Sequence, residues 1–319
     1  MTSTKTSFAT DRAARLPGSA TAREMTENPN VRRAAVIGFG EVGGILAADL
    51  VAAHAAVAAF DTAPEAQARA RDAGLGAGTA AEACRGAGMV FVCVTAGSVL
   101  EAMRSLAGCL DGAPFVVDVN SVSPGTKAEA ARIIEAAGGR YVEAAVMASV
   151  PPKRIATPML LGGPHAEAFR DAADGLGMNL TVFSPEIGRA SSVKMCRSVM
   201  IKGLEALTTE CMLAARQYGV EADVLRTMGD TLPHPDWPGL ARYVISRALI
   251  HGKRRAEEMR EVARTVEDAG VEPLLSAAIA ERQDWAWRRG AEMGDARNAA
   301  DLSTLLDALT QTLHARAAE

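Results

Sequence analysis

The chain has 319 residues, which is long enough for two domains with separate hydrophobic cores. With 23% charged residues and a formal net charge of −4, it lacks the basic field that nucleic-acid binding needs. It also lacks an apolar stretch of about 18 residues that would span a bilayer. Its five cysteines form no CxxC pair, as is typical of reduced thiols in the cytoplasm, and no cluster of His, Cys, Asp and Glu has metal-ligand spacing. We therefore expect a cytoplasmic protein without nucleic-acid, membrane or metal partners.

Residues 1–30 are rich in Ser, Thr, Ala and Arg and show no apolar periodicity, which predicts a disordered leader. A basic, hydroxyl-rich start can also be a transit peptide, an alternative that Asp11, Glu24 and Glu27 weaken. We expect the folded chain to begin at about residue 31.

The first apolar stretch has the pattern of a dinucleotide-binding unit. Residues 34–37 lead directly into a GxGxxG motif and a helical segment, and a second apolar run, residues 55–60, ends in Asp61. Gly38 permits the tight turn, Gly40 lets a pyrophosphate approach the backbone, and Gly43 lets the helix pack on the strand. A glycine-rich turn in another kind of α/β protein is the alternative. The residues predicted to contact the cofactor are Gly38, Phe39, Gly40, Glu41, Val42 and Gly43.

Asp61 bears on the choice of cofactor. A carboxylate at the tip of the second strand accepts hydrogen bonds from the ribose hydroxyls and repels a 2′-phosphate, which favours NAD. Arg69 and Arg71 lie on the next predicted helix and could reach a 2′-phosphate, so NADP stays possible.

Helical and apolar segments then alternate as far as residue 183. Strands are predicted over residues 89–94, 115–119, 141–146, 159–161 and 180–183, and helices over residues 64–72, 80–84, 99–106 and 125–137. This alternation indicates a doubly wound parallel sheet of Rossmann type. Ligands bind outside the carboxyl ends of such strands, where Thr95, Asn120, Ser121 and residues 147–149 are found.

From residue 191 onward the periodicity is helical. A first helix is predicted over residues 191–218 with Gly219 as its stop, and others over residues 221–228, 240–250, 254–269, 273–287 and 301–315. We therefore predict an α/β dinucleotide-binding domain at residues 31–190. An all-α domain for substrate binding and dimerisation would follow at residues 191–319.

Lys194 lies in the first turn of the 191–218 helix, where a side chain can face the nicotinamide, and Ser198 and Lys202 share its helical face. In a dry cleft near other cations, an amine whose pKa approaches neutrality can exchange a proton with a substrate hydroxyl. A solvated lysine on a helix surface is the alternative.

Three motifs resemble those of the β-hydroxyacid dehydrogenase superfamily, whose members include 3-hydroxyisobutyrate and 6-phosphogluconate dehydrogenases. They are VIGFGEVGGILAADL at the cofactor turn, DVNSVSPGTK at the family's D-x-S-T-x-x-P loop, and GRASSVKMCRSVMIKGLEAL at its G-x-x-x-x-x-K-x-x-x-N helix. The resemblance implies that Lys194 is the general acid/base, that the nicotinamide binds between the two domains, and that the helical domains pair in a homodimer. It also implies that the D-x-S-T loop and an S-G-G segment grip the carboxylate of a small anionic substrate.

The chain departs from this pattern at three places. Asn120 and Ser121 stand where Ser and Thr are usual, Ser198 stands where the family has Asn, and the S-G-G place is held by Met147, Ala148 and Ser149. The three polar replacements can still donate hydrogen bonds, but the bulky Met147 should reshape the pocket. We therefore expect a 3-hydroxy acid with an apolar or aromatic substituent. Two plainer interpretations stay open: Asn120 and Ser121 only cap the next helix, and Met147 belongs to the core.

The C-terminal half resembles a divergent branch of the superfamily whose last domain has no settled function, through VEDAGVEP and the preceding HGKRRAEEMREV. Arg254 and its neighbouring cations could bind an anionic substrate, including across a dimer interface. The alternative is a solvated helix face on which Arg254 and Arg255 pair with the glutamates of residues 257–261. His234, in a proline-rich turn, could line the cleft or be an ordinary loop residue.

Together these features predict an NAD(P)-dependent oxidoreductase that moves hydride reversibly at the hydroxyl-bearing carbon of a 3-hydroxy acid. Lys194 and Ser198 would be catalytic. The residues predicted at the substrate are Asn120, Ser121, Met147, Ser149, His234 and Arg254, and those at the cofactor include Asp61 and Thr95. The same fold could also be an imine reductase, although those enzymes usually lack the lysine, or a non-catalytic NAD-binding sensor.

Overall fold

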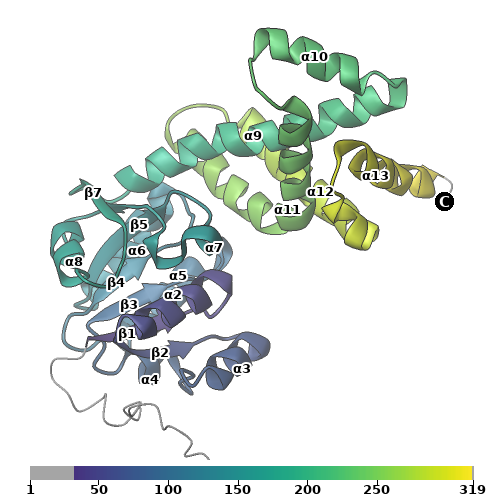
Figure 1. Cartoon of the computed structure of the whole chain (residues 1–319). Coiled ribbons are helices and arrows are strands. Elements are labelled where there is room, and N and C mark those ends of the chain that lie inside the picture. Colours follow the sequence, from purple (N-terminus) through teal and green to yellow (C-terminus); the bar gives the residue numbers. More distant parts are fainter. Residues whose placement is uncertain (1–31, 318–319) are drawn as a thin grey trace, which may run out of the picture.

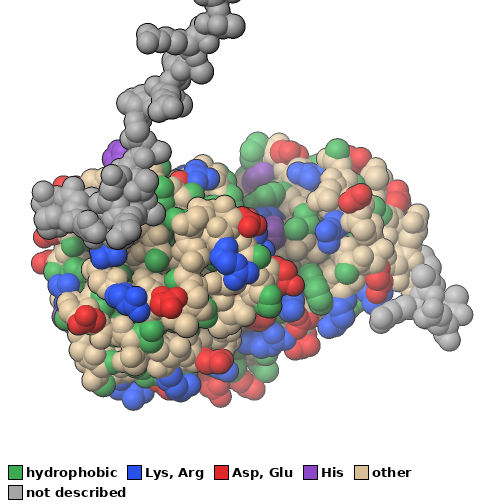
Figure 2. All heavy atoms as spheres, turned by 90° about the horizontal axis from the view of Figure 1, so that it is seen from below, with side chains coloured by type: hydrophobic (Ala, Val, Ile, Leu, Met, Phe, Trp, Pro, Cys, Tyr) green, Lys and Arg blue, Asp and Glu red, His purple; other side chains and the backbone are tan. Residues whose placement is uncertain are grey.

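The computed structural model of the chain describes residues 32–317, so the leader predicted at residues 1–30 lies outside the described residues. Figure 1 shows an α/β part and a helical part joined by the long helix α9 (Arg189–Tyr218). In the space-filling view of Figure 2 they form two lobes, with basic and acidic side chains interspersed over both. No helix within residues 32–317 is long and apolar enough to cross a membrane.

The α/β part contains a seven-stranded sheet in the order β2-β1-β3-β4-β5-β6-β7. The strands are β1 (Arg33–Ile37), β2 (Ala56–Phe60), β3 (Met89–Val92), β4 (Phe115–Asp118), β5 (Arg140–Val146), β6 (Met159–Gly162) and β7 (Leu180–Ser184). Neighbouring strands are parallel except β5 and β6, which are antiparallel. The predicted Rossmann-type fold is confirmed, but the expectation of a wholly parallel sheet is wrong at this one pair. Only residues 147–158 join β5 to β6, with the short helix α7 (Val150–Lys153) among them, so the chain turns back instead of crossing over.

Helices cover both faces of the sheet. They are α2 (Glu41–Ala52), α3 (Pro64–Asp72), α4 (Ala80–Cys84), α5 (Val99–Ala107), α6 (Pro124–Ala136) and α8 (Ala166–Ala172). Successive residues of β1 enter different cores: Val36 packs with Leu46 of α2, and Ala35 packs with Met103 of α5. Because both faces are buried, the strands read as unbroken apolar runs rather than alternating ones.

The helical part consists of α9, α10 (Glu221–Thr231), α11 (Trp237–Asp268), α12 (Leu274–Met293) and α13 (Leu302–Ala317). The two helices predicted over residues 240–250 and 254–269 form the single helix α11. Its Gly252 lies within the helix at a close approach to α12: a Cβ there would lie 2.3 Å from the Gln283 carbonyl oxygen. Gly290 on α12 makes the reciprocal approach to Leu249. These glycines therefore reflect helix packing rather than a chain turn.

Candidate active site

The glycine loop between β1 and α2 has the shape that a pyrophosphate requires. Gly38 has a φ of +93°, and a Cβ on it would lie 2.4 Å from the Cys93 carbonyl oxygen. A Cβ on Gly43 would lie 1.9 Å from the Gly38 carbonyl oxygen, so the start of α2 packs directly on the turn. A Cβ on Gly40 would meet no atom within 4 Å, and no side chain caps α2. The loop is thus open where backbone N–H groups of the helix N-terminus can bind phosphate, and its residues fit a dinucleotide.

Replacing Gly43 with alanine is expected to weaken cofactor binding about ten- to a hundredfold, the equivalent of the about 1–3 kcal/mol that overpacking costs. Gly44→Ala is the matched control, because the nearest atom to its Cβ is Cε1 of Phe39 at 3.9 Å. That variant should bind normally and be slightly more stable, since alanine favours the helix. Fluorescence titration with NADH and NADPH measures the cofactor affinity of each variant, and equal affinities for the two variants would contradict this role of Gly43.

Asp61 and Arg69 both contact the backbone of Phe39 in this loop. The Asp61 carboxylate accepts hydrogen bonds from the N–H groups of Phe39 at 2.6 Å and Ala63 at 2.8 Å, and Arg69 donates to the Phe39 carbonyl at 3.2 Å. Arg71 instead packs beside Gly76. A carboxylate and a guanidinium therefore lie together at the end of β2. Of the other predicted cofactor residues, Glu41 and Thr95 are exposed and Val42 is half-buried.

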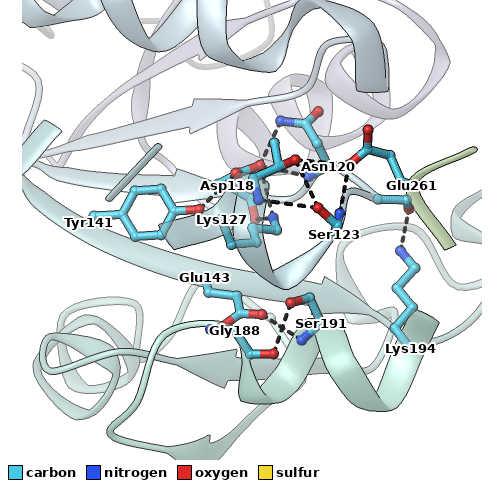
Figure 3. Close-up of polar contacts among 12 residues, drawn as sticks. Asp118, Asn120, Ser123, Lys127, Tyr141, Glu143, Gly188, Ser191, Lys194 and Glu261 are labelled. Atoms are coloured by element: carbon cyan, nitrogen blue, oxygen red, sulfur yellow. Dashed lines mark hydrogen bonds and ion pairs between the residues drawn. The ribbon is translucent and has the colours of Figure 1, made fainter. Parts of the chain in front are cut away.

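The loop after β4 is anchored by a buried charge pair that sequence reasoning did not single out. Lys127 of α6 and Asp118 of β4 are fully buried, with Lys127 Nζ 3.0 Å from Oδ1 of Asp118 (Figure 3). The hydroxyl of Tyr141 donates to the other carboxylate oxygen at 2.8 Å. Both charged residues lie within the DVNSVSPGTK motif, so the motif itself was the available signal. This pair holds the loop that reaches toward α9.

Within that loop, Asn120 and Ser121 have different surroundings. The Asn120 amide donates to Oδ1 of Asp118 at 2.6 Å, so this buried side chain is turned toward the anchor. Ser123 caps α6 by accepting from the N–H of Thr126 at 3.2 Å, so the interpretation that Asn120 and Ser121 cap this helix is wrong. Ser121 instead faces α9, and its Oγ lies 2.5 Å from Nζ of Lys194.

The start of α9 is fixed by Glu143, which sequence reasoning also missed. Its buried carboxylate accepts hydrogen bonds from the N–H groups of Gly188 at 2.6 Å and Ser191 at 2.5 Å (Figure 3). A carboxylate at a helix N-terminus satisfies free N–H groups and complements the helix dipole. The signal for it was an acidic residue in the middle of an apolar strand. Glu143 thereby sets the direction in which α9 leaves the sheet and places Lys194 opposite Ser121.

The surroundings of Lys194 favour its neutral form. Its pKa is lowered from the usual 10.5 to about 7, chiefly by burial; Glu258 opposes this shift, and Lys202, Lys127 and Arg254 add to it. A primary amine with such a pKa can both accept and donate a proton near neutral pH. Lys194 therefore differs from a solvated surface lysine.

The helical part contacts the same loop through Glu261 of α11. One oxygen of its buried carboxylate accepts from the N–H of Ser123 at 2.8 Å and from the hydroxyl of Thr126 at 2.9 Å. The predicted solvated face on residues 254–261 is therefore wrong for Glu258 and Glu261, which are buried between α11 and its neighbours. It is also wrong for Arg255, which is buried and pairs with Glu205 of α9 instead of a glutamate of α11. Arg254 is different, since its side chain is 57% exposed.

A polar seam, formed by Ser198 and Lys202 of α9 and by Arg254 and Glu258 of α11, runs between the two helices next to Lys194. Lys202 Nζ donates to the Ser198 hydroxyl at 3.1 Å and lies 2.9 Å from Oε2 of Glu258. Arg254 lies 2.6 Å from the other Glu258 oxygen. Of these four residues, only Arg254 is exposed.

The remaining predicted substrate residues lie in two places. Met147 is half-buried rather than part of the core, and its carbonyl accepts from Arg197 of α9 at 3.2 Å, so the segment that also carries the exposed Ser149 lies beside α9. His234 lines a cavity of about 660 Å³ near Trp237, at the other end of α9 from Lys194. Within one chain the structure does not bring His234 to the site, because about 35 Å of helix separates the two ends. No group of His, Cys, Asp and Glu in residues 32–317 could hold a metal ion.

Residues 33–178 match a family model described as the NAD binding domain of 6-phosphogluconate dehydrogenase, and residues 215–285 match a domain of unknown function. The solved structure of a conserved hypothetical protein from Sinorhizobium meliloti 1021 is 34% identical, with a TM-score of 0.69, covering 89% of this chain and 97% of that one. A second solved structure is that of a conserved protein of unknown function, described as structurally similar to 3-hydroxyacid dehydrogenases. It is 31% identical, with a TM-score of 0.62, and the match covers 81% of this chain and 99% of that one. The 3-hydroxyisobutyrate dehydrogenase of Pseudomonas aeruginosa is 29% identical over 199 residues, which are 60% of this chain and 66% of that protein.

Proposed function

The chain belongs to the β-hydroxyacid dehydrogenase superfamily, and on this premise we propose that it catalyses reversible hydride transfer at the hydroxyl-bearing carbon of a 3-hydroxy acid, with Lys194 as general acid/base. The observation that carries the proposal is the contact between Lys194 and Ser121, which joins a lysine that can lose its proton near neutral pH to the loop after β4. The apolar Met147 beside α9 supports a substrate with an apolar or aromatic substituent.

When bound, the nicotinamide would accept the hydride in oxidation and return it in reduction. The glycine loop would hold its pyrophosphate. Asp61 would hold the adenosine ribose and favour NAD, and Arg69 beside it keeps NADP possible. In oxidation, neutral Lys194 takes the hydroxyl proton, and in reduction its ammonium form returns it.

The substrate's anionic group would bind between the loop after β4 and α11. Ser121 and Ser198 carry hydroxyls that can donate to it, and the exposed Arg254 offers further N–H groups. Asn120 contributes indirectly, by tying the loop to Asp118. His234 could join the site only from a second copy of the chain.

We further propose a homodimer through the helical part. This pairing is supported by an exposed apolar stripe on α9. The side chains of Met200 and Leu207 are 66% and 67% exposed, and Leu204 lies between them. Leu207→Glu is expected to yield monomers in light scattering at micromolar concentration, while Glu257→Gln keeps the dimer. A parent protein that is already monomeric would contradict the pairing.

The test of the proposed function is reduction of NAD and NADP across a panel of 2- and 3-hydroxy acids that differ in their substituents. We expect turnover with a 3-hydroxy acid that bears an apolar or aromatic group. Tight cofactor binding without turnover on any acid would instead favour a non-catalytic sensor. Reduction of cyclic imines that survives Lys194→Ala would favour an imine reductase.

The pH dependence of oxidation is expected to follow the protonation of Lys194. Because its pKa is lowered to about 7, the amine is neutral and able to accept a proton above that pH and is protonated below it. The kcat/KM for oxidation should therefore fall about tenfold per pH unit below 7, whereas reduction, which needs the ammonium form, should fall above 7. Initial rates in both directions measure this, and an oxidation profile without an inflection between about pH 6 and 8 would contradict it.

A further inference from the structure

Glu258 binds two cations with one carboxylate. Its Oε2 lies 2.9 Å from Nζ of Lys202, and its Oε1 lies 2.6 Å from Arg254. Burial alone would raise the pKa of Glu258, but Lys202, Arg254 and Lys194 together outweigh it and lower that pKa to about 2, so the carboxylate is ionised at neutral pH. The seam thus holds three full charges, with a net charge of +1, between α9 and α11.

The seam also lies on the face of α9 that carries Lys194. Residues 194, 198 and 202 follow one another at the i, i+4 spacing, which places them in a row on one side of the helix. Lys202 leans back to bond Ser198, the direction in which helical side chains point. Glu258 therefore keeps the Lys202 ammonium in the row that ends at Lys194.

We propose that Glu258 is a positioning residue for the reaction, an inference that rests on the proposed function. By holding Lys202 and Arg254 beside Lys194, it sets the balance of charge that decides whether Lys194 is protonated. Without its carboxylate, the cations near Lys194 would be unopposed, and the amine would lose its proton at a lower pH. Without Lys202, the carboxylate would dominate, and the amine would keep its proton to a higher pH.

The charged groups around Lys194 come from three helices. Lys202 lies on α9, Glu258 and Arg254 on α11, and Lys127 on α6. Glu261, the next acidic group along the buried face of α11, is engaged by Ser123, Thr126 and Arg264. Lys127 is paired with Asp118. This leaves Glu258 as the carboxylate that acts on Lys194 and is itself shared between two cations.

The test is the reactivity of the Lys194 amine in the full-length protein. Only the neutral amine reacts with trinitrobenzenesulfonate, so labelling of Lys194, quantified by mass spectrometry from about pH 5 to 10, gives its titration midpoint without any substrate. The parent midpoint is expected near pH 7. In Glu258→Gln it should fall by about one pH unit, and in Lys202→Met it should rise by about as much.

The opposite directions separate this role from a structural one. Both substitutions break the same ion pair, so a loss of packing alone would move both midpoints in the same direction. Glu257→Gln removes the same charge from the preceding residue of α11, about 100° round the helix, and should leave the midpoint in place. Midpoints that stay unchanged, or that move together, in Glu258→Gln and Lys202→Met would overturn the proposal. Because labelling needs no turnover, a protein that oxidises no hydroxy acid would refute the proposed function while leaving this result to be judged on its own.

Discussion

Replacing Lys194 with alanine is expected to lower kcat for hydroxy-acid oxidation by about 10²–10⁴-fold, the usual contribution of a positioned general acid/base. The reason is the place of its amine, 2.5 Å from Ser121 Oγ and with a pKa lowered to about 7. The affinity for cofactor should stay the same, because the glycine loop lies on a different element. Steady-state rates and fluorescence titration with NADH measure the two effects separately.

Two further variants distinguish a role of Lys194 in proton transfer from a role of its positive charge alone. Lys194→Arg keeps a cation that cannot release its proton near neutral pH, so it should be nearly as inactive as the alanine variant. Lys253→Ala removes an exposed lysine that lies over the Trp287 ring, and it should keep activity within about twofold. An arginine variant with parental activity would show that Lys194 acts through its charge and not as an acid/base.

Lys127→Met is expected to destabilise the α/β part by about 3–5 kcal/mol, the cost of leaving a buried charge without its partner. Lys127 and Asp118 are both fully buried, and Lys127 also donates to the Asp118 backbone carbonyl at 2.9 Å. Urea unfolding, monitored by far-UV circular dichroism, measures this decrease in the free energy of unfolding. Because the pair anchors the loop that carries Ser121, the variant should also lose activity at temperatures where it stays folded.

The double variant Asp118→Asn with Lys127→Met should recover part of that stability, since no uncompensated charge remains. Arg104→Ala is the control, because the ion pair of Arg104 with Glu129 is solvent-exposed and should contribute at most about 0.5 kcal/mol. If Lys127→Met cost no more stability than Arg104→Ala, the buried pair would not anchor the loop after β4.

Much of the α/β part could be predicted because its signals are local. The glycine motif and the apolar runs each lie within a few residues of the feature that they specify, so the predicted strands and helices are found within a few residues of their expected positions. The short helices α7 and α8 were not predicted. The helix that carries Lys194 begins at Arg189, two residues before its predicted start, because Glu143 satisfies its first N–H groups from β5. That contact joins residues 48 positions apart, so the sequence around Arg189 does not show where the helix begins.

The helical part was harder to predict because its charges can be interpreted in two ways. A row of arginines and glutamates at helical spacing is usually solvated, and nothing in α11 alone shows that Glu258 faces Lys202 or that Glu261 faces Ser123. The place of His234 at the far end of α9 likewise depends on how α10 and α11 fold back on α9.

By itself the sequence determined the order and kind of the elements, the dinucleotide-binding turn and the position of Lys194 at the start of a long helix, because periodicity and motif spacing are properties of neighbouring residues. Tertiary structure alone decided the antiparallel β6, the contact of Glu261 with the loop after β4, and the charge balance around Lys194. The physical reason is that burial and the distance between charges arise only when segments far apart in the chain pack together, and these two quantities set the pKa of an amine.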